Sequence, residues 1–512
     1  MNGADALIET LVLNGVAACF ANPGTSEMQF VSALDRQPAM RPVLCLFEGV
    51  ATGAADGYGR MSGRPACTLL HLGPGYGNGL ANLHNARRAF TPVVNIIGDH
   101  ATWHRALDAP LTSDIVALAA PNSLWVKSAA SADEVGPLAS EAVAASLGPP
   151  GGPASLILPA DCAWSTTTKT GPRVAAPAKA AADLALVEMI AGRIRAADKP
   201  VLLLGSGACG ETALAAAGRI GGRGVRVLTD TFIARQGRGA GRFSPDRMAY
   251  FGEMALADLA GTDLMVLVET TAPVAFFAYP GRPSVLVPDG CETVTLADRG
   301  QDGARALAHL ADLLGGEESD AQPLALPDAP SGALTPAAAG AAIARHLPEG
   351  AIVSDDSVTS GQAILGLTQG ARPHDWLGLT GGAIGQGIPV AVGAAVACPG
   401  RKVVSLNGDG AAMYTVQGLW TLARESLDVT VVVFANNAYR ILGIELGRTG
   451  AGNPGPAASR LLRLDEPAID WVAVARGLGV AGRRCETAEA FDAAFAEAMA
   501  EPGPHFIEAA IA

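Results

Sequence analysis

The sequence predicts an α/β protein of three Rossmann-like domains, each built around a parallel sheet. Short β-branched runs alternate with Ala-rich segments of helical periodicity along the whole chain. Several of these runs are hydrophobic throughout, which is typical of strands covered on both faces of a parallel sheet. The length of 512 residues corresponds to about three domains, at roughly 150 residues each.

Two stretches rich in Pro, Ala, Ser and Thr, residues 165–183 and 317–335, lack apolar periodicity and indicate linkers. They divide the chain into domains at 1–164, 184–316 and 336–512. The expected strands are residues 43–47, 66–70, 93–97, 155–158, 201–204, 225–229, 264–268, 351–354, 402–406 and 429–435. The expected helices include residues 4–14, 411–424 and 488–500.

The composition excludes several classes of partner. With 49 acidic and 36 basic side chains the net charge is −13, whereas a nucleic acid or an anionic membrane needs a basic face. No apolar run is long enough to span a membrane, and the acids Asp5 and Glu9 are unlike the start of a signal peptide. The eight cysteines form no CxxC pair, which argues against a zinc site or a disulfide framework. We therefore expect a cytoplasmic protein.

The carboxyl ends of two expected strands in the C-terminal domain carry oxygen ligands. The strand at 402–406 is followed by the sequence NGDG and a helix, and the strand at 429–435 is followed by two Asn residues. If the strands are parallel neighbours, the Asp and one Asn can share a hard cation such as Mg²⁺, while the glycines and the helix start admit a diphosphate. The candidate residues for this site are Gly408, Asp409, Gly410, Ala411 and Asn436.

This pattern resembles the thiamine diphosphate (ThDP) signature of the acetolactate synthase/benzoylformate decarboxylase superfamily. The resemblance implies three metal ligands: Asp409, one Asn, and the backbone carbonyl two residues after that Asn. Asn436 lies at the family's spacing (436 − 409 = 27) and would pair with the carbonyl of Ala438. Motif order instead selects Asn437, with the carbonyl of Tyr439. We favour Asn436, because the residues before it then form the strand interior.

A second motif, residues 379–389 (LTGGAIGQGIP), resembles the family's Gly-rich loop. The resemblance implies that Ile384 wedges ThDP into its V shape. Glycines such as Gly382 would let the backbone crowd against the aminopyrimidine ring. A Gly-rich turn between a strand and a helix, with Ile384 in the core, is the alternative account.

The N-terminal domain carries the third motif. The strand at 43–47 leads into Glu48, at the start of a helix rich in small residues that ends in the sequence DGYGR. The resemblance implies that Glu48 hydrogen-bonds N1′ of the aminopyrimidine and so favours the tautomer that activates the thiazolium, which requires a carboxyl group in apolar surroundings. The alternative is a Glu placed favourably at a helix N-terminus.

Further candidates surround these motifs. The sequence NPGTSE at 22–27 resembles a substrate loop, which implies that Thr25 and Ser26 face the substrate; a turn with Ser26 as a helix cap is the alternative. His71, in the sequence HLGPGYGN, and His100, after the strand at 93–97, are candidates for proton transfer. His71 is equally well explained as a strand-end side chain that bonds to its loop. Glu445 occupies the family's substrate-steering position and supports neither known specificity.

The middle domain contains a strand followed by GxGxxG at 205–210, with Asp230 at the end of the next strand. This is a dinucleotide-binding fingerprint. In the family this domain binds FAD in acetolactate synthases and is often only structural, so we expect FAD binding as the less favoured outcome. The stretch 272–280 has no His, unlike the benzoylformate decarboxylases.

Together, the resemblance implies a ThDP- and Mg²⁺-dependent enzyme that decarboxylates a small 2-oxo acid and ligates the product to a second carbonyl, as acetolactate synthases do. It also implies a homodimer or homotetramer, with each site shared between the pyrimidine-binding N-terminal domain of one subunit and the diphosphate-binding C-terminal domain of another. A benzoylformate decarboxylase-like enzyme or an acyloin lyase is one alternative. An FAD- or NAD-dependent oxidoreductase built on the GxGxxG motif is another, and a catalytically idle subunit that binds ThDP is the third.

Overall fold

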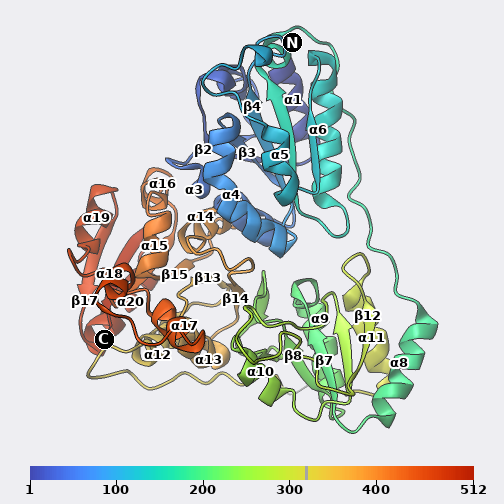
Figure 1. Ribbon diagram of the computed structural model, residues 1–512, viewed down its shortest axis with the longest axis vertical. Coiled ribbons are helices and arrows are strands. Elements are labelled where there is room, and N and C mark those ends of the chain that lie inside the picture. Colours follow the sequence, from blue (N-terminus) through green and yellow to red (C-terminus); the bar gives the residue numbers. More distant parts are fainter. Residues whose placement is uncertain (318–320, 512) are drawn as a thin grey trace.

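The computed structural model describes residues 1–317 and 321–511, and these residues form three α/β units with one sheet each (Figure 1). Almost all strand pairs are parallel, and helices pack on the faces of the sheets. The predicted fold class is therefore confirmed. Among the described residues, no helix is long and apolar enough to cross a membrane.

The N-terminal unit has a six-stranded parallel sheet in the order β2-β1-β3-β4-β6-β5. Its central strands are buried along their whole length, as expected for strands covered by helices on both faces. The strands are β1 (Ala18–Asn22), β2 (Arg41–Leu44), β3 (Ala66–Leu70), β4 (Val93–Asp99), β5 (Trp125–Ser128) and β6 (Pro153–Pro159). The helices are α1 (Gly3–Leu13), α2 (Met28–Leu34), α3 (Glu48–Ser62), α4 (Leu72–Ala89), α5 (Ile115–Ala119), α6 (Ala132–Leu147) and α7 (Ala160–Trp164).

The middle unit has a five-stranded parallel sheet in the order β10-β8-β7-β11-β12. The strands are β7 (Pro200–Leu204), β8 (Arg226–Thr229), β10 (Asp246–Arg247), β11 (Leu264–Val268) and β12 (Glu292–Ala297). The helices are α8 (Leu184–Ala196), α9 (Glu211–Gly221), α10 (Gly252–Asp258) and α11 (Gly303–Leu314).

The C-terminal unit has a seven-stranded sheet in the order β17-β18-β16-β15-β13-β14-β9. Its edge strand β9 (Gln236–Arg238) comes from within the expected middle domain and pairs antiparallel with β14. The middle segment of the chain thus contributes one strand to the C-terminal sheet. The other strands are β13 (Ala351–Asp356), β14 (His374–Leu377), β15 (Val403–Gly408), β16 (Val429–Ala435), β17 (Ala481–Cys485) and β18 (His505–Ala510). The helices are α12 (Pro336–His346), α13 (Gly361–Leu367), α14 (Gly387–Ala397), α15 (Asp409–Tyr414), α16 (Gly418–Arg424), α17 (Arg440–Arg448), α18 (Pro456–Leu462), α19 (Trp471–Gly477) and α20 (Ala488–Ala500).

Two expected elements differ from the structure. The strand expected at 43–47 ends at Leu44, which lies opposite Ala21 of β1. Because β1 ends at Asn22, residues 46 and 47 have no residue of that strand beside them. The helix expected at 411–424 is two helices, α15 and α16. At the break between them, the Thr415 hydroxyl donates a hydrogen bond to the carbonyl of Gly385 (2.8 Å), which ties this turn to the Gly-rich loop.

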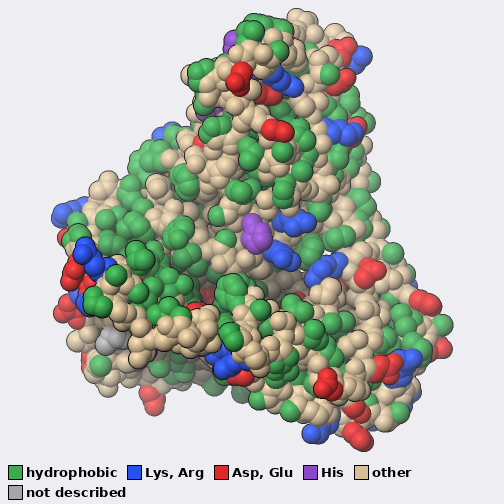
Figure 2. Space-filling model, viewed as in Figure 1, with side chains coloured by type: hydrophobic (Ala, Val, Ile, Leu, Met, Phe, Trp, Pro, Cys, Tyr) green, Lys and Arg blue, Asp and Glu red, His purple; other side chains and the backbone are tan. Residues whose placement is uncertain are grey.

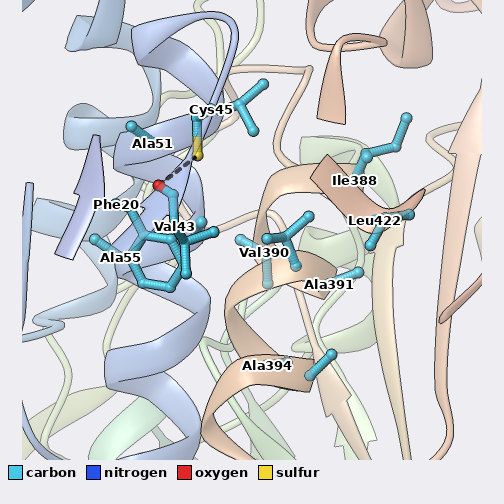
Figure 3. Close-up of a cluster of buried hydrophobic side chains, with 14 of the residues drawn as sticks. Phe20, Val43, Cys45, Ala51, Ala55, Ile388, Val390, Ala391, Ala394 and Leu422 are labelled. Atoms are coloured by element: carbon cyan, nitrogen blue, oxygen red, sulfur yellow. Dashed lines mark hydrogen bonds between the residues drawn. The ribbon is translucent and has the colours of Figure 1, made fainter. Parts of the chain in front are cut away.

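The N- and C-terminal units share one hydrophobic core, in which α3 packs against α14 (Figure 3). The two helices approach at backbone distance because both carry glycines at the contact. A Cβ atom at Gly57 would lie 2.1 Å from the carbonyl oxygen of Val390, and one at Gly393 would lie 1.8 Å from that of Ala54. This packing holds Glu48, at the start of α3, and the loop before α14 in one rigid arrangement.

Candidate active site

The strand ends at β15 and β16 meet as the sequence predicts. The two strands are parallel neighbours, with Gly408 opposite Phe434. The next residue, Asp409, is buried, and its carboxylate accepts hydrogen bonds from the backbone N–H groups of Gly410 (2.8 Å) and Asn437 (2.6 Å). Burial raises the pKa of Asp409. A bound cation would therefore stabilise the ionised carboxylate at this position.

The two Asn residues have different surroundings in the turn after β16. The side-chain oxygen of Asn436 accepts a hydrogen bond from the N–H of Ala438 (2.9 Å) and closes the turn. Asn437 has a left-handed backbone (φ 55°), which aims its N–H at Asp409. The structure thus brings Asp409, Asn436, Asn437 and Ala438 together, and the backbone N–H of Asn437 contacts the Asp409 carboxylate.

No cluster of three or more His, Cys, Asp or Glu side chains that could hold a metal ion exists within residues 1–317 and 321–511. A metal at the β15–β16 edge would therefore depend on one carboxylate together with amide and backbone oxygens. Such an oxygen-only set is the kind that Mg²⁺ accepts when phosphate oxygens and water complete its coordination. The residues present fit this metal.

The Gly-rich loop before α14 is held from beneath by Asp356, at the end of β13. One carboxylate oxygen of this buried residue accepts hydrogen bonds from three successive backbone N–H groups, those of Gly385 (2.8 Å), Gln386 (2.9 Å) and Gly387 (3.2 Å). Burial raises the pKa of Asp356 to about 7. Asp356 follows the strand expected at 351–354, and no motif of the sequence indicated its contact with the loop.

The same loop is held from above by α4 of the N-terminal unit. The Asn85 side chain donates to the carbonyl of Ala383 (2.8 Å) and accepts from its N–H (3.2 Å). Gly382 has a left-handed backbone (φ 75°), and Ile384 is half-buried within the loop. Ile384 is therefore partly accessible and lies outside the core clusters formed by the described residues of this unit.

Glu48 is buried as the first residue of α3. Its carboxylate accepts a hydrogen bond from the side-chain amide of Asn78 (3.0 Å), on α4. Gly75 leaves room for the second oxygen, because a Cβ atom there would lie 3.1 Å from it. Asn78 and Gly75 both belong to the sequence HLGPGYGN, so this motif holds the glutamate in place.

His71 directly follows β3 and forms a network with the loop after β1. Its Nδ1 lies 2.9 Å from a carboxylate oxygen of Glu27 and 3.3 Å from the hydroxyl of Ser26. Glu27 is buried and also accepts hydrogen bonds from the N–H of Gly24 (2.7 Å) and the Ser26 hydroxyl (2.7 Å). An acidic partner at Nδ1 favours a proton there and leaves Nε2 as the reactive nitrogen.

Glu27 was missed as a site residue, although the sequence NPGTSE contains it. Ser26 joins this network and does not cap a helix, while Thr25 is exposed on the same turn. The space for Glu27 comes from β4, where a Cβ atom at Gly98 would lie 1.7 Å from its carboxylate. The signal in the sequence is Gly98, near the end of β4, because only a residue without a side chain leaves room for the Glu27 carboxylate.

Both halves of this arrangement match known protein families. Residues 1–118 match the family model "Thiamine pyrophosphate enzyme, N-terminal TPP binding domain", and residues 359–509 match "Thiamine pyrophosphate enzyme, C-terminal TPP binding domain". The whole chain is 53% identical, over 99% of the relative's length, to a Mycobacterium tuberculosis protein named "Putative acetolactate synthase large subunit IlvX". It is 30% identical to benzoylformate decarboxylase of Pseudomonas aeruginosa, over 98% of this chain and 97% of the relative.

The chain belongs to the ThDP-dependent acetolactate synthase/benzoylformate decarboxylase family. Its fold agrees with this assignment. The structure of the ThDP-dependent 4-hydroxybenzoylformate decarboxylase of Rhodococcus jostii RHA1 superposes with a TM-score of 0.87 at 25% identity, and the match covers 100% of this chain and 99% of that one.

The second histidine candidate of this ThDP-dependent enzyme lies at the same sheet edge as the first. His100 follows β4, which is the parallel neighbour of β3. It is half-buried, its ring lies 5.3 Å from that of His104, and its Nε2 has no hydrogen-bond partner among the described residues. His100 is therefore placed near His71 by topology, without a carboxylate bonded to its ring.

The substrate-steering candidate Glu445 lies on α17 and is engaged by the middle unit. Its carboxylate accepts a hydrogen bond from the hydroxyl of Tyr279 (2.6 Å). A glutamate held by a partner from another unit positions the helix that carries it. Its observed contact is thus with the protein and not with an open pocket.

The GxGxxG motif of the middle unit does not fit a dinucleotide. Glu269, buried and in a left-handed conformation (φ 51°), fills the space above the glycines: a Cβ atom at Gly207 would lie 1.8 Å from its carboxylate. The carboxylate accepts from the N–H of Gly303 (3.1 Å) and pairs with Lys179 (2.6 Å). The Glu269 side chain therefore occupies the space against the glycine backbone that a bound ligand would need.

Proposed function

We propose that this ThDP-dependent enzyme uses Mg²⁺, decarboxylates a 2-oxo acid and ligates the acyl unit to a second carbonyl compound, as an acetolactate synthase does. The observation that carries the proposal is the buried carboxylate of Asp409, bonded to the turn after the neighbouring strand. The name of the 53% identical relative supports the acetolactate synthase-like direction.

For the metal, we propose Asp409 and Asn436 as ligands, with the backbone carbonyl of Ala438; Asn437 with the carbonyl of Tyr439 is the alternative. The side-chain oxygen of Asn436 accepts one hydrogen bond in the turn and keeps a second lone pair for a metal, whereas Asn437 contacts Asp409 through its backbone N–H. The Asn436→Ala and Asn437→Ala variants separate the two assignments by their Mg²⁺ dependence. Loss of this dependence in Asn437→Ala alone would move the ligand to Asn437 and the carbonyl to Tyr439.

The chain's own residues supply positioning and proton transfer. Bound ThDP provides the nucleophilic carbon and the electron sink for decarboxylation. Glu48, buried and oriented by Asn78, holds a proton at the aminopyrimidine ring. His71, oriented by Glu27, moves a proton at its Nε2 to or from the substrate-derived carbon. Thr25 and Ser26 border this site and are proposed to face the substrate, with His100 as the second proton-transfer group.

We also propose that the enzyme works as a homodimer or homotetramer. Hydrophobic side chains gather on the face of the C-terminal unit below the N-terminal unit (Figure 2). Met413 and Tyr414, at the end of the short helix α15 that begins with Asp409, are both exposed in the single chain. Apolar surface next to the site is what a partner subunit would cover.

The test is CO₂ release from pyruvate, 2-oxobutyrate and benzoylformate, with ThDP and Mg²⁺ present. We expect acyloin products in the wild type. Glu48→Gln should abolish turnover, while the exposed Glu9→Gln on α1 should leave it unchanged. Absence of CO₂ from every 2-oxo acid would refute the proposal.

A simple decarboxylase is the second candidate. The 30% identity to benzoylformate decarboxylase over nearly the whole chain and the similarity to the Rhodococcus structure favour it. Aldehyde as the sole product, with no acyloin even when an acceptor aldehyde is added, would select this activity over carboligation.

A further inference from the structure

A buried ion pair lies in the last turn of α3, at the opposite end of the helix from Glu48. Asp56 and Arg60 are one helical turn apart, and their side chains are 0% and 1% exposed. The guanidinium donates to both carboxylate oxygens, through Nε (2.8 Å) and through one terminal nitrogen (2.6 Å). Because this two-point contact fixes the plane of the guanidinium, its remaining N–H groups have set directions.

These remaining N–H groups reach both ends of the Gly-rich loop. Where the chain enters the loop, they donate to the carbonyl of Gly378 (2.7 Å) and to the hydroxyl of Thr380 (3.1 Å). Where the chain leaves the loop for α14, they donate to the side-chain oxygen of Gln386 (3.1 Å). Ile384 lies between these points in the chain. One side chain of the N-terminal unit thus connects the two ends of the segment that carries Ile384.

Contacts from the other units complete the surroundings of Arg60. The guanidinium also donates to the carbonyl of Ala234, in the middle segment of the chain (3.3 Å), and Arg235 donates in return to the carbonyl of Arg60 (3.3 Å). The Thr380 hydroxyl passes the contact on to α4 by donating to the backbone carbonyl of Asn85 (2.8 Å). The five N–H groups of the guanidinium are therefore all engaged within the protein, by residues from all three units.

We propose that Arg60 is a positioning residue for ThDP, which keeps the two ends of the Gly-rich loop at the separation that the bound cofactor requires, and that Asp56 in turn orients Arg60. The inference rests on the proposed function, which places ThDP at this loop. Asp356 holds the exit of the loop, whereas Arg60 connects its entry with its exit. A change at Arg60 should therefore alter the loop and the cofactor without touching the reacting atoms.

The first test measures ThDP binding by calorimetry, with Mg²⁺ present, in the wild type and in Arg60→Lys. A lysine keeps a positive charge beside the buried carboxylate of Asp56, but its single nitrogen cannot replace the fork that spans both ends of the loop. We expect ThDP binding to weaken by about tenfold to a hundredfold, which corresponds to the loss of a hydrogen bond to a charged group. With ThDP saturating, kcat should fall while KM for the 2-oxo acid changes little, because the loop positions the cofactor.

Thr380→Val is the second variant, because it removes one contact at the loop entry and leaves the buried ion pair in place. We expect it to weaken ThDP binding by about tenfold. Thr421→Val is the matched control. Thr421 also joins two units through its hydroxyl, which donates from α16 to the carbonyl of Leu44 on β2 (3.1 Å), and its loss should leave ThDP affinity as in the wild type.

Hydrogen exchange provides a readout that needs no cofactor. In the ThDP-free enzyme, the backbone N–H groups of residues 385–387 should exchange faster in Arg60→Lys than in the wild type, while those of β16 stay equally protected. Unchanged ThDP affinity and loop exchange in both variants would overturn this inference and leave the proposed function intact. Loss of protection throughout Arg60→Lys, with wild-type ThDP affinity in Thr380→Val, would also overturn it, since the ion pair would then serve overall stability. A wild type that binds no ThDP would overturn the proposed function as well.

Discussion

The contact between α3 and α14 leads to a prediction for Gly393→Ala. The added methyl group would lie 1.8 Å from the carbonyl oxygen of Ala54 and 2.6 Å from the backbone nitrogen of Tyr58. Both atoms belong to the backbone of α3, so no side-chain rotation can relieve the clash. Ordinary van der Waals contact begins at 3.4 Å, which means that the helices must separate locally by 3.4 − 1.8 = 1.6 Å.

The cost follows from the shared core. Overpacking a well-packed interior costs about 1–3 kcal/mol, and a backbone clash belongs at the upper end. Ala in place of Gly gains about 0.5–1 kcal/mol of helix stability, which offsets part of this. We expect Gly393→Ala to lower the free energy of unfolding by about 2 kcal/mol, the difference between a cost of about 3 and a gain of about 1.

Gly192→Ala on α8 is the matched control, because a Cβ atom there meets nothing within 4 Å. Thermal and urea unfolding are measured for both variants. For a unit of 150–250 residues, each kcal/mol corresponds to about 2–4 °C in Tm. Gly192→Ala should be as stable as the wild type or more so. A Gly393→Ala protein with an unchanged Tm and urea midpoint would refute the close helix contact.

Three further predictions concern buried acids. Glu27→Gln should lower kcat by about tenfold to a hundredfold with ThDP saturating, because a hydrogen bond to a charged group contributes about 1.5–3 kcal/mol. An unchanged kcat would exclude Glu27 as the group that orients His71. The pKa of Asp356 is raised to about 7 in the native enzyme, whereas the unfolded chain releases this proton near pH 4. Because only the native state holds the proton between these values, the free energy of unfolding falls as pH rises from about 4 to 7. Urea unfolding at pH 5 and pH 8 measures this loss, and the difference in unfolding free energy between the two pH values should be smaller for Asp356→Asn than for the wild type. An equal difference in both proteins would contradict the prediction. The purified enzyme should carry no flavin, because Glu269 occupies the space above Gly207; visible flavin absorption would show that this acid moves aside.

Much of the candidate site could be predicted because its residues lie in short continuous motifs. Asp409 and the Asn pair follow two strands joined by one helical crossover, and parallel topology places both strand ends at one edge. Glu48 and the Gly-rich loop are recognisable in the same way. Local periodicity placed the strands β3, β11 and β16 at their observed bounds, because each is a buried apolar run with polar or Gly-containing flanks.

The contacts between motifs could not be predicted. Glu27 meets His71 because β1 and β3 are adjacent in the sheet, with Asn22 opposite Leu70, and strand order is not written in either motif. The same holds for Asp356, whose carboxylate binds the backbone of the Gly-rich loop. The GxGxxG motif matched a nucleotide loop in its pattern, yet the carboxylate of Glu269, more than 60 residues later, lies directly against Gly207.

By itself, the sequence determined the α/β class, the positions of most strands, and the motifs of a ThDP enzyme. These features depend on local patterning and on residue types that one strand or one turn requires. Only the tertiary structure decided which acid orients His71, which backbone N–H groups bind Asp409, and which acid holds the Gly-rich loop. The physical reason is that each of these contacts joins segments brought together by sheet order and by the packing between units, which no single segment encodes.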